Sequence, residues 1–268
     1  MGIEITEELK NHPLYKYYEL PIKPVPEDVA AKIMSFKYDN ENGLNIADIN
    51  RMFDDGYLPC EFGLFKCPDG GSIMANLTDM PGVTPEMFDW WFAWHGLDTF
   101  RYVIWDKDDH YYCQSQSVEK NLDSSLSMKE RYWDTWHDIK EALADGQPAV
   151  PVKLHFVHPT EVGFDPEKLK DFKGTIVCTP APAIMIHFLR PTATGSELRT
   201  RFYMGYMNGP DGKPVPMPEG AGPQMPDEIK EMMGRSMLMH NVKEFTHLAE
   251  ILPDLYNEFK DNFTVGLK

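Results

Sequence analysis

The chain has 268 residues and a hydrophobic content of 42%, enough to bury a sizeable core in one large domain or in a domain with an extension. Its 42 acidic residues against 26 basic ones give a formal charge of -16, which repels phosphate backbones and anionic membrane surfaces. No apolar run approaches the roughly 18 residues of a membrane span, and the N-terminus MGIEITEELK lacks the basic and apolar regions of a signal peptide, so we expect a cytoplasmic protein with no nucleic-acid or membrane partner.

The first sixty residues are rich in proline and acidic side chains, with short helical signals at residues 26–34 and 45–53. We expect residues 1–60 to form an extension that wraps around a main domain of residues 61–268. That domain begins with CEFGLFKCPDGGSIMANLT, in which two alternating apolar runs flank the turn sequence PDGG, and this pattern predicts a β-hairpin. Residues 80–83 are expected to form a loop.

A helix is predicted to begin after Thr84, which is a good N-cap residue and is followed by Pro85 and Glu86. The aromatic sequence MFDWWFAWH continues this helix, so much of its surface must be buried. Four of the six tryptophans lie between Trp90 and Trp105, and we expect them to form one wall of the core or of a pocket.

Most of the remaining chain has the composition of β-strands. The strand candidates are RYVIW, HYYCQS, TWHDIKEAL, VPVKLHFVH, GTIVC, AIMIHFLRP and ELRTRFYMGYM. A loop rich in proline and glycine at residues 208–226 precedes a long helix from residue 227 to about residue 261, with a kink or an interruption expected near Pro253. We therefore predict an α+β fold of the helix-grip type, in which a curved antiparallel sheet and a C-terminal helix enclose an elongated cavity.

The four cysteines form no CxxC pair and are too few to staple a chain of this size. We therefore expect reduced thiols, mostly buried as small hydrophobic side chains. They are Cys60, Cys67, Cys113 and Cys178.

The C-terminal helix carries two polar side chains on its apolar stripe, His240 and Glu244. The apolar members of this stripe are Ile229, Met233, Met237, Leu248, Leu252, Leu255 and Phe259. A glutamate buried without a partner would cost several kcal/mol or take up a proton. His240 and Glu244 could pair with each other, or a rotation of the helix near Gly234 could place them in water; alternatively, residues four apart can bind one metal ion together.

Partners for such a site come from nine histidines and many carboxylates, and composition does not choose among them. His110 lies in a tyrosine-rich strand candidate, and Glu141 follows His137 and Ile139 in alternation, so His110 and Glu141 are both candidates to point into the cavity.

At this point the chain resembles the family of phloretin hydrolases and 2,4-diacetylphloroglucinol hydrolases, zinc enzymes that cut acyl groups from phloroglucinol rings. The resemblance covers most of the chain. Its landmarks are MPGVTPEMFDWWFAWH, RYVIWDKDDH, LHFVHPTEVGFD, ELRTRFYMG and MHNVKE.

The resemblance implies a Bet v 1-like helix-grip domain with an N-terminal extension and a zinc site of two histidines and two glutamates. The implied zinc ligands are His110, Glu141, His240 and Glu244, with Glu130 as a rival to Glu141. The implied residues at the substrate ring are Tyr102, His187 and Tyr203. Cys113 stands where the diacetylphloroglucinol enzymes of the family have an asparagine, which puts that hydrogen bond in question.

The reaction implied by this resemblance is zinc-dependent hydrolysis of the carbon–carbon bond between an acyl group and a phloroglucinol ring. The expected substrate is phloretin, giving phloroglucinol and 3-(4-hydroxyphenyl)propionate. Deacetylation of 2,4-diacetylphloroglucinol, a noncatalytic helix-grip carrier of aromatic ligands and a metal-free polyketide cyclase are the alternatives. An acidic, aromatic-rich chain of this kind is also compatible with a homodimer.

Overall fold

The computed structural model describes residues 2–143, 147–218, 220–221 and 225–267. Its largest sheet has the strand order β1-β2-β3-β9-β8-β7, and a second sheet has the order β4-β5-β6. The bridge between Val157, directly after β6, and Cys178 in β7 joins the two sheets edge to edge. The strands are β1 (Tyr38–Asp39), β2 (Gly63–Lys66), β3 (Ser72–Pro81), β4 (His110–Ser115), β5 (Thr135–Glu141), β6 (Val150–Phe156), β7 (Thr175–Thr179), β8 (Ile184–Thr192), β9 (Gly195–Met204), β10 (Tyr206–Asn208) and β11 (Pro214–Pro216).

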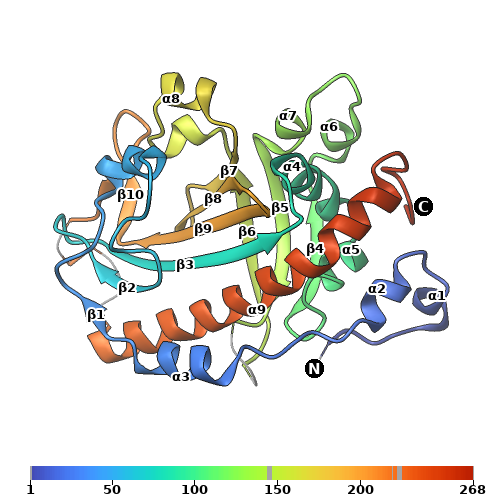
Figure 1. Cartoon of the computed structure of the whole chain (residues 1–268), viewed down its shortest axis with the longest axis horizontal. Helices are drawn as coiled ribbons and strands as arrows, with labels where there is room; N and C mark the ends of the chain where they lie inside the picture. Colours follow the sequence, from blue (N-terminus) through green and yellow to red (C-terminus); the bar gives the residue numbers. More distant parts are fainter. Residues whose placement is uncertain (1, 144–146, 219, 222–224, 268) are drawn as a thin grey trace.

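The longest helix, α9, runs diagonally across the curved sheet, as Figure 1 shows, and the arrangement is the predicted α+β helix grip. Among the strands of the described residues, all pairs are antiparallel except β1 with β2, which confirms the predicted sheet type. The helices are α1 (Glu7–Lys10), α2 (Tyr15–Glu19), α3 (Glu27–Ser35), α4 (Pro85–Trp94), α5 (Thr99–Val103), α6 (Val118–Leu122), α7 (Met128–Tyr132), α8 (Pro166–Asp171), α9 (Asp227–Phe259) and the 3-10 turns η1 (Ile46–Phe53), η2 (His95–Leu97) and η3 (Pro159–Val162).

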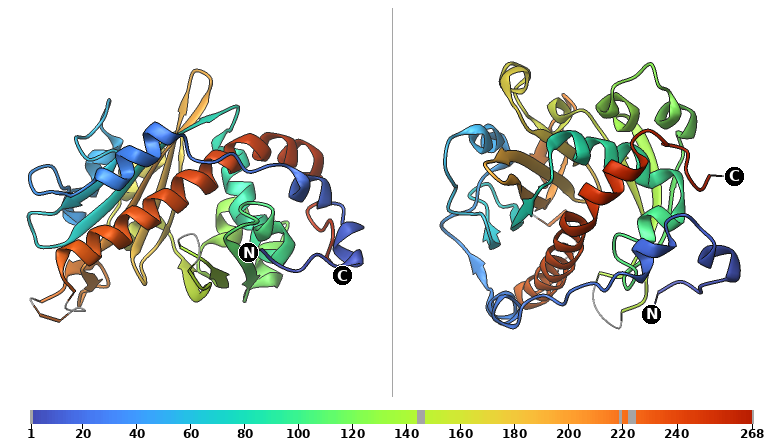
Figure 2. Two further views of the ribbon diagram at one scale, coloured as in Figure 1. Left: turned by 90° about the horizontal axis from the view of Figure 1, so that it is seen from below. Right: turned by 45° about the vertical axis from the view of Figure 1, so that its right-hand side comes forward.

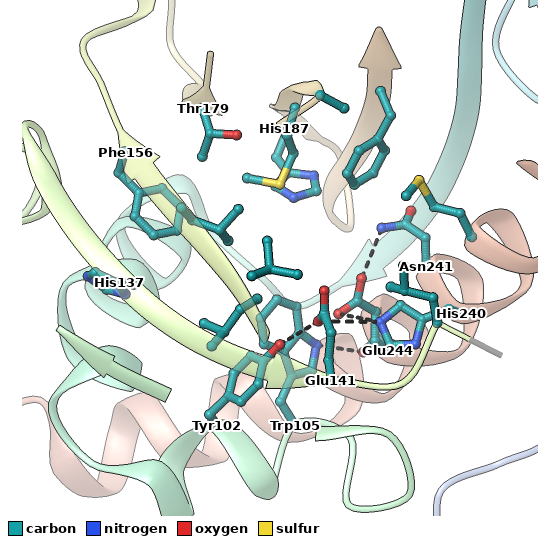
Figure 3. A pocket seen from close by; sticks show the side chains of 18 of the residues that line it. Tyr102, Trp105, His137, Glu141, Phe156, Thr179, His187, His240, Asn241 and Glu244 are labelled. Atoms are coloured by element: carbon teal, nitrogen blue, oxygen red, sulfur yellow. Dashed lines mark hydrogen bonds and ion pairs between the residues drawn. The ribbon is translucent and has the colours of Figure 1, made fainter. Parts of the chain in front are cut away.

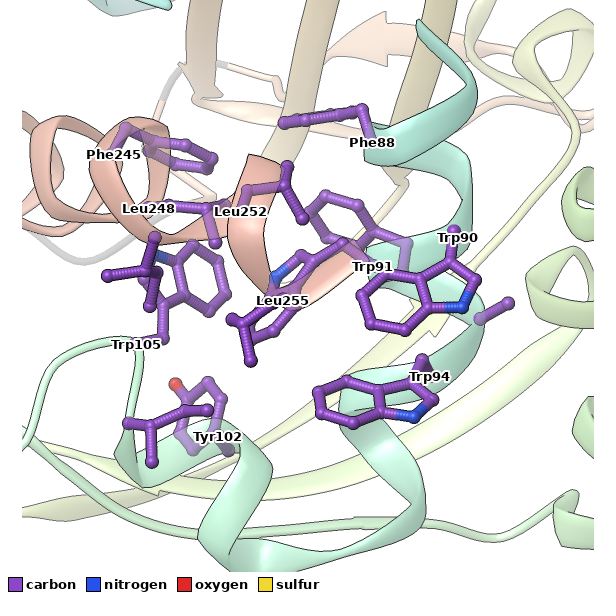
Figure 4. Packing of buried hydrophobic residues seen from close by; sticks show 14 of the residues in the cluster. Phe88, Trp90, Trp91, Trp94, Tyr102, Trp105, Phe245, Leu248, Leu252 and Leu255 are labelled. Carbon is purple, nitrogen blue, oxygen red and sulfur yellow. The ribbon is translucent and has the colours of Figure 1, made fainter. Parts of the chain in front are cut away.

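The main core lies between α4 and the C-terminal half of α9 (Figure 4). Thr84 caps α4 as predicted, because its side chain accepts a hydrogen bond from the backbone N–H of Met87. The tryptophans of this helix are fully buried, and Trp90 stacks on Trp94 with ring centroids 4.6 Å apart. This aromatic block fixes α9 against the sheet and so sets the position of every side chain that α9 contributes to the cavity.

The segment before residue 60 contributes side chains to all three hydrophobic clusters, including Leu14 in the first, Ile49 in the second and Ile33 in the third. Its α3 lies beside the first half of α9, as the two views of Figure 2 also show. The second cluster covers the face of the main sheet that points away from α9. The segment therefore wraps around the sheet and helix, while a domain boundary at residue 60 stays a prediction.

The predicted strand RYVIW is wrong, because residues 99–103 form the short helix α5. The β-branched and aromatic residues of this run favour a strand, but Asp98 caps a helix by accepting from the backbone N–H of Phe100. The buried Arg101 then donates to the carbonyls of Trp94 and Val265, and these tertiary contacts hold the helical conformation.

Two expectations for the last helix also need correction. The helix α9 continues through Pro253, so an interruption there is wrong, while a kink at this proline stays a prediction. Ile229 and Met233, expected on the buried stripe, are exposed, whereas Glu231 and Gly234 are buried in these first turns. The reason is geometric, because residues four apart drift by about 40° around a helix of 3.6 residues per turn.

The loop predicted at residues 208–226 contains the small hairpin β10–β11, and its residues 219 and 222–224 lie outside the described part of the chain. All four cysteines are buried and unpaired with one another, as predicted. No helix in the described part of the chain is both long and apolar enough to cross a membrane.

Candidate metal centre and substrate cavity

A cavity of about 150 Å³ lies between α9 and the inner face of the curved sheet (Figure 3). An engineered apolar cavity of about this volume binds benzene, so the space accepts one aromatic ring. Its wall is mostly apolar, and polar groups gather at two ends. The lining residues are Phe92, His95, Tyr102, Trp105, His137, Ile139, Glu141, Leu143, Val152, Leu154, Phe156, Thr179, Pro182, Ala183, Met185, His187, Phe202, Met237, His240, Asn241 and Glu244.

At one end, the structure brings His110, Glu141, His240 and Glu244 together. Nε2 of His110 lies 3.9 Å from Oε2 of Glu141 and 3.5 Å from Oε2 of Glu244. Nε2 of His240 lies 3.9 Å and 3.8 Å from the same two oxygens. Two imidazole nitrogens and two carboxylate oxygens therefore surround one point.

Local structure explains why these four side chains meet. His110 and Glu141 are direct partners across β4 and β5, and the ladder shifts register just after His110. Such an irregularity re-aims a side chain at the end of a strand. His240 and Glu244 lie one turn apart on α9, so they project side by side towards that strand pair.

Further contacts fix the orientation of the ligand candidates. Nδ1 of His110 bonds to the backbone carbonyl of Tyr102 at 3.0 Å, and the two rings stack with centroids 3.8 Å apart. The hydroxyl of Tyr102 donates to Oε2 of Glu141 at 2.6 Å. The amide of Asn241 donates to Oε1 of Glu244 at 3.0 Å. Hydrogen bonds of this kind orient metal ligands and set which imidazole nitrogen is free.

The chemistry of this donor set fits a divalent metal ion. Nε2 of His110 is fully buried and finds no hydrogen-bond partner among the described residues, although its Nδ1 is held by Tyr102. Burial disfavours the charged form of His240, yet Glu244, Asp109 and Glu141 raise its pKa to about 9. The centre is therefore anionic and attracts a cation. Two imidazoles and two carboxylates are ligands that zinc accepts.

His187 lies across the cavity from this centre (Figure 3). Its Nδ1 forms a hydrogen bond with the hydroxyl of Thr200 at 3.0 Å. Its ring packs against Phe245 with the ring centroids 4.7 Å apart. Burial lowers the pKa of His187 to about 3, so the ring is neutral at pH 7. A neutral imidazole in an apolar wall can hold a hydroxyl group of a bound ring.

Two candidates from the sequence lie elsewhere. Tyr203 is buried in the second hydrophobic cluster, on the face of the sheet that points away from α9, because alternation along β9 turns its neighbour Phe202 to the cavity instead. We therefore remove Tyr203 from the site. Glu130 lies in a capping box with Ser127 at the start of α7, exposed to solvent, so it does not reach the metal centre.

Sequence reasoning missed Asp109 and Asn241, which directly precede His110 and follow His240. Oδ2 of Asp109 lies 3.3 Å from Nδ1 of His240. The available signal was a carboxylate or amide beside each histidine, but that signal is common and does not show which ring the group contacts. Cys113 is buried outside the cavity lining, and its sulfur lies near His95 and His137.

A helix grip whose cavity focuses two imidazoles and two carboxylates on one point has the architecture of an enzyme site. The family model of the DAPG hydrolase PhiG domain matches residues 44–257 of the chain. The chain belongs to this DAPG hydrolase family, and it is a hydrolase of carbon–carbon bonds.

Similar proteins span nearly the whole chain. Phloretin hydrolase of Eubacterium ramulus is 34% identical and covers 97% of this chain and 95% of its own. A 2,4-diacetylphloroglucinol hydrolase of Pseudomonas sp is 26% identical, over 94% of this chain and 90% of its own. Among solved structures, Ara h 8.0201 matches 67% of this chain and 99% of its own at 11% identity, with a TM-score of 0.34.

Proposed function

We propose that this protein hydrolyses the bond between an acyl group and a phloroglucinol ring with one zinc ion, and that phloretin is its substrate. The observation that carries the proposal is the convergence of His110, Glu141, His240 and Glu244 at one end of a ring-sized cavity. The products would be phloroglucinol and 3-(4-hydroxyphenyl)propionate.

The four ligand candidates suit a dication because two neutral imidazoles and two carboxylates balance its charge. A bound zinc ion would supply Lewis acidity, which polarises a carbonyl group and makes water a better nucleophile. Tyr102 supports this end of the cavity, since its hydroxyl holds Glu141 and its carbonyl holds His110. Both contacts restrict the ligand candidates to the orientation that the centre requires.

The ring end of the cavity must make an aryl group able to leave. Hydrolysis would otherwise release an aryl carbanion, so a ring carbon first takes up a proton while a ring hydroxyl becomes a ketone. Water then adds to the acyl carbonyl, the carbon–carbon bond breaks, and its electron pair enters the ring ketone as an enolate that recovers a proton. We assign His187 to the ring hydroxyls, where a neutral imidazole can bind and relay that proton.

Phloretin is preferred to diacetylphloroglucinol because the phloretin hydrolase is the more similar relative, at 34% against 26% identity. The deciding experiment incubates metal-loaded and chelator-treated protein with each compound and identifies the products by mass spectrometry. We expect about one zinc per chain and phloretin cleavage that chelation abolishes. Cleavage by metal-free protein at the full rate would contradict the metal role, and binding without cleavage would favour a noncatalytic carrier.

A further inference from the structure

Thr179, the last residue of β7, carries a hydroxyl group without a partner in the cavity wall. The residue is fully buried, and its Oγ1 has no hydrogen bond to any described residue. Figure 3 shows this side chain at the same end of the cavity as His187. Buried hydroxyl groups nearly always have a partner, since an unsatisfied one lowers the stability of the fold.

Comparable threonines of the same sheets are satisfied. Oγ1 of Thr175, at the other end of β7, donates to Asp89 at 2.5 Å. Oγ1 of Thr200 bonds to His187, and Oγ1 of Thr135 donates to the carbonyl of Tyr132. Thr179 therefore differs from these threonines, because it lines the cavity and its buried hydroxyl has no protein partner among the described residues.

Among the described lining residues, Nδ1 of His137 is another buried polar atom without a hydrogen-bond partner. Backbone covers this atom, because a Cβ placed on Gly96 would lie only 2.5 Å from it. Nδ1 of His137 therefore packs against the Gly96 backbone, which leaves no room for a ligand group between them. Thr179 remains the polar group of the described wall that most plainly lacks a partner.

The register of β7 and β8 relates Thr179 to His187. Val177 is the direct partner of His187, and Thr179 is the direct partner of Met185. Thr179 lies two residues beyond Val177, so it shares the inner face with His187 as a diagonal neighbour about 7–8 Å away. Two polar groups thus stand side by side at the end of the cavity opposite the metal centre.

We propose that Thr179 binds a second hydroxyl group of the substrate ring, in the meta position to the hydroxyl at His187. This inference rests on the proposed function and specifies its substrate class as rings with at least two meta hydroxyl groups. A phloroglucinol ring carries hydroxyls on alternate carbons and can satisfy both residues at once. A ring that lacks one of these hydroxyls leaves a buried polar group unpaired and is bound more weakly.

The test compares Thr179→Val, which keeps the shape and removes the hydroxyl, with Thr179→Ser, which restores a hydroxyl. Binding of phloroglucinol, which has no acyl bond to cleave, is measured by calorimetry on zinc-loaded protein, alongside zinc content and melting temperature. We expect Thr179→Val to bind phloroglucinol about tenfold more weakly, as for the loss of one hydrogen bond, with zinc unchanged and a melting temperature at or above that of the wild type. Thr179→Ser should recover most of the affinity.

Thr175→Val is the matched control, because it removes a partnered threonine of the same strand. It should lower the melting temperature and leave the affinity for phloroglucinol unchanged, whereas Thr179→Val should lower the affinity and leave the melting temperature unchanged or higher. The proposal would be overturned if Thr179→Val bound the ring as tightly as the wild type, or if Thr179→Val melted at a lower temperature than the wild type. It would also be overturned if the wild type bound no phloroglucinol. Wild-type protein that binds phloroglucinol through Thr179 but does not cleave phloretin would contradict the proposed function and keep the Thr179 subsite.

Discussion

Oδ2 of Asp109 lies 3.3 Å from Nδ1 of His240, while Nε2 of the same ring lies 3.8 Å from Glu244. A carboxylate behind a metal-binding histidine fixes the ring and raises its basicity, and its removal typically costs 10–100-fold in metal affinity, on the order of 1–3 kcal/mol. We expect Asp109→Ala to weaken zinc binding by about this factor. Competition with a chromophoric chelator measures it directly.

Asp108→Ala is the control, because it removes the same charge from the neighbouring residue but keeps the contact between Asp109 and His240. It should bind zinc as tightly as the wild type. Equal zinc affinity in the wild type and Asp109→Ala would show that this contact does not support the centre.

A second prediction separates Glu141 from Glu130, its rival in the sequence. Glu141→Ala should lose stoichiometric zinc and turnover together, because it removes one of the two carboxylates at the centre. Glu130→Ala breaks a capping box and should lower only the melting temperature, by a small amount. Zinc content after gel filtration decides between them, and a zinc-free Glu130→Ala with a zinc-loaded Glu141→Ala would reverse our assignment.

The sequence predicted the helix grip because the strand alternation and the long helical stretch are local patterns. The same patterns placed His240 beside Glu244 and turned Glu141 to the side of His137 and Ile139, all of which line the cavity. Local patterns failed where tertiary contacts decide. Capping by Asp98 and burial of Arg101 convert an apparent strand into α5.

Side-chain direction in the sheet was the other source of error. Phe202 and Tyr203 are adjacent aromatic residues in a run without alternation of polar and apolar side chains, so the sequence does not show which one faces the helix. Pairing across β8 and β9 places Thr200 opposite His187 on the inner face, which also turns Phe202 inward and Tyr203 outward. His110 and Glu141, the partners of His240 and Glu244, come from other parts of the chain. Only the folded structure brings these four residues together.

A third prediction concerns His187. If it binds a ring hydroxyl and relays a proton, His187→Ala should retain zinc and its melting temperature while turnover falls by about 10²–10⁴-fold. Zinc stoichiometry, melting temperature and single-turnover rate are measured on one preparation. A near wild-type rate would remove His187 from the reaction, and loss of zinc or folding would assign it a structural role.

The last prediction concerns the face of β9 that points away from the cavity, where Glu61 pairs with Arg199 and Arg201 at 2.5 Å each. Burial alone would raise the pKa of Glu61, but the two arginines hold this pKa at about 2, below its ordinary value of 4.5. A depressed carboxyl pKa stabilises the fold above the pKa of the unfolded chain, and this contribution disappears as the pH falls from about 4.5 towards 2.

The stabilisation that the depressed pKa of Glu61 contributes is on the order of 3 kcal/mol at neutral pH. We therefore expect the free energy of unfolding of the wild type to fall over this pH range more steeply than that of Glu61→Gln, which cannot titrate. Glu61→Gln should also be less stable at pH 7, since Arg199 and Arg201 stay buried without a compensating charge. Urea unfolding at several pH values measures both effects, with the exposed Glu41→Gln as control. Parallel stability curves for the wild type and Glu61→Gln would show that the contacts of Glu61 with Arg199 and Arg201 do not cause the loss of stability at low pH.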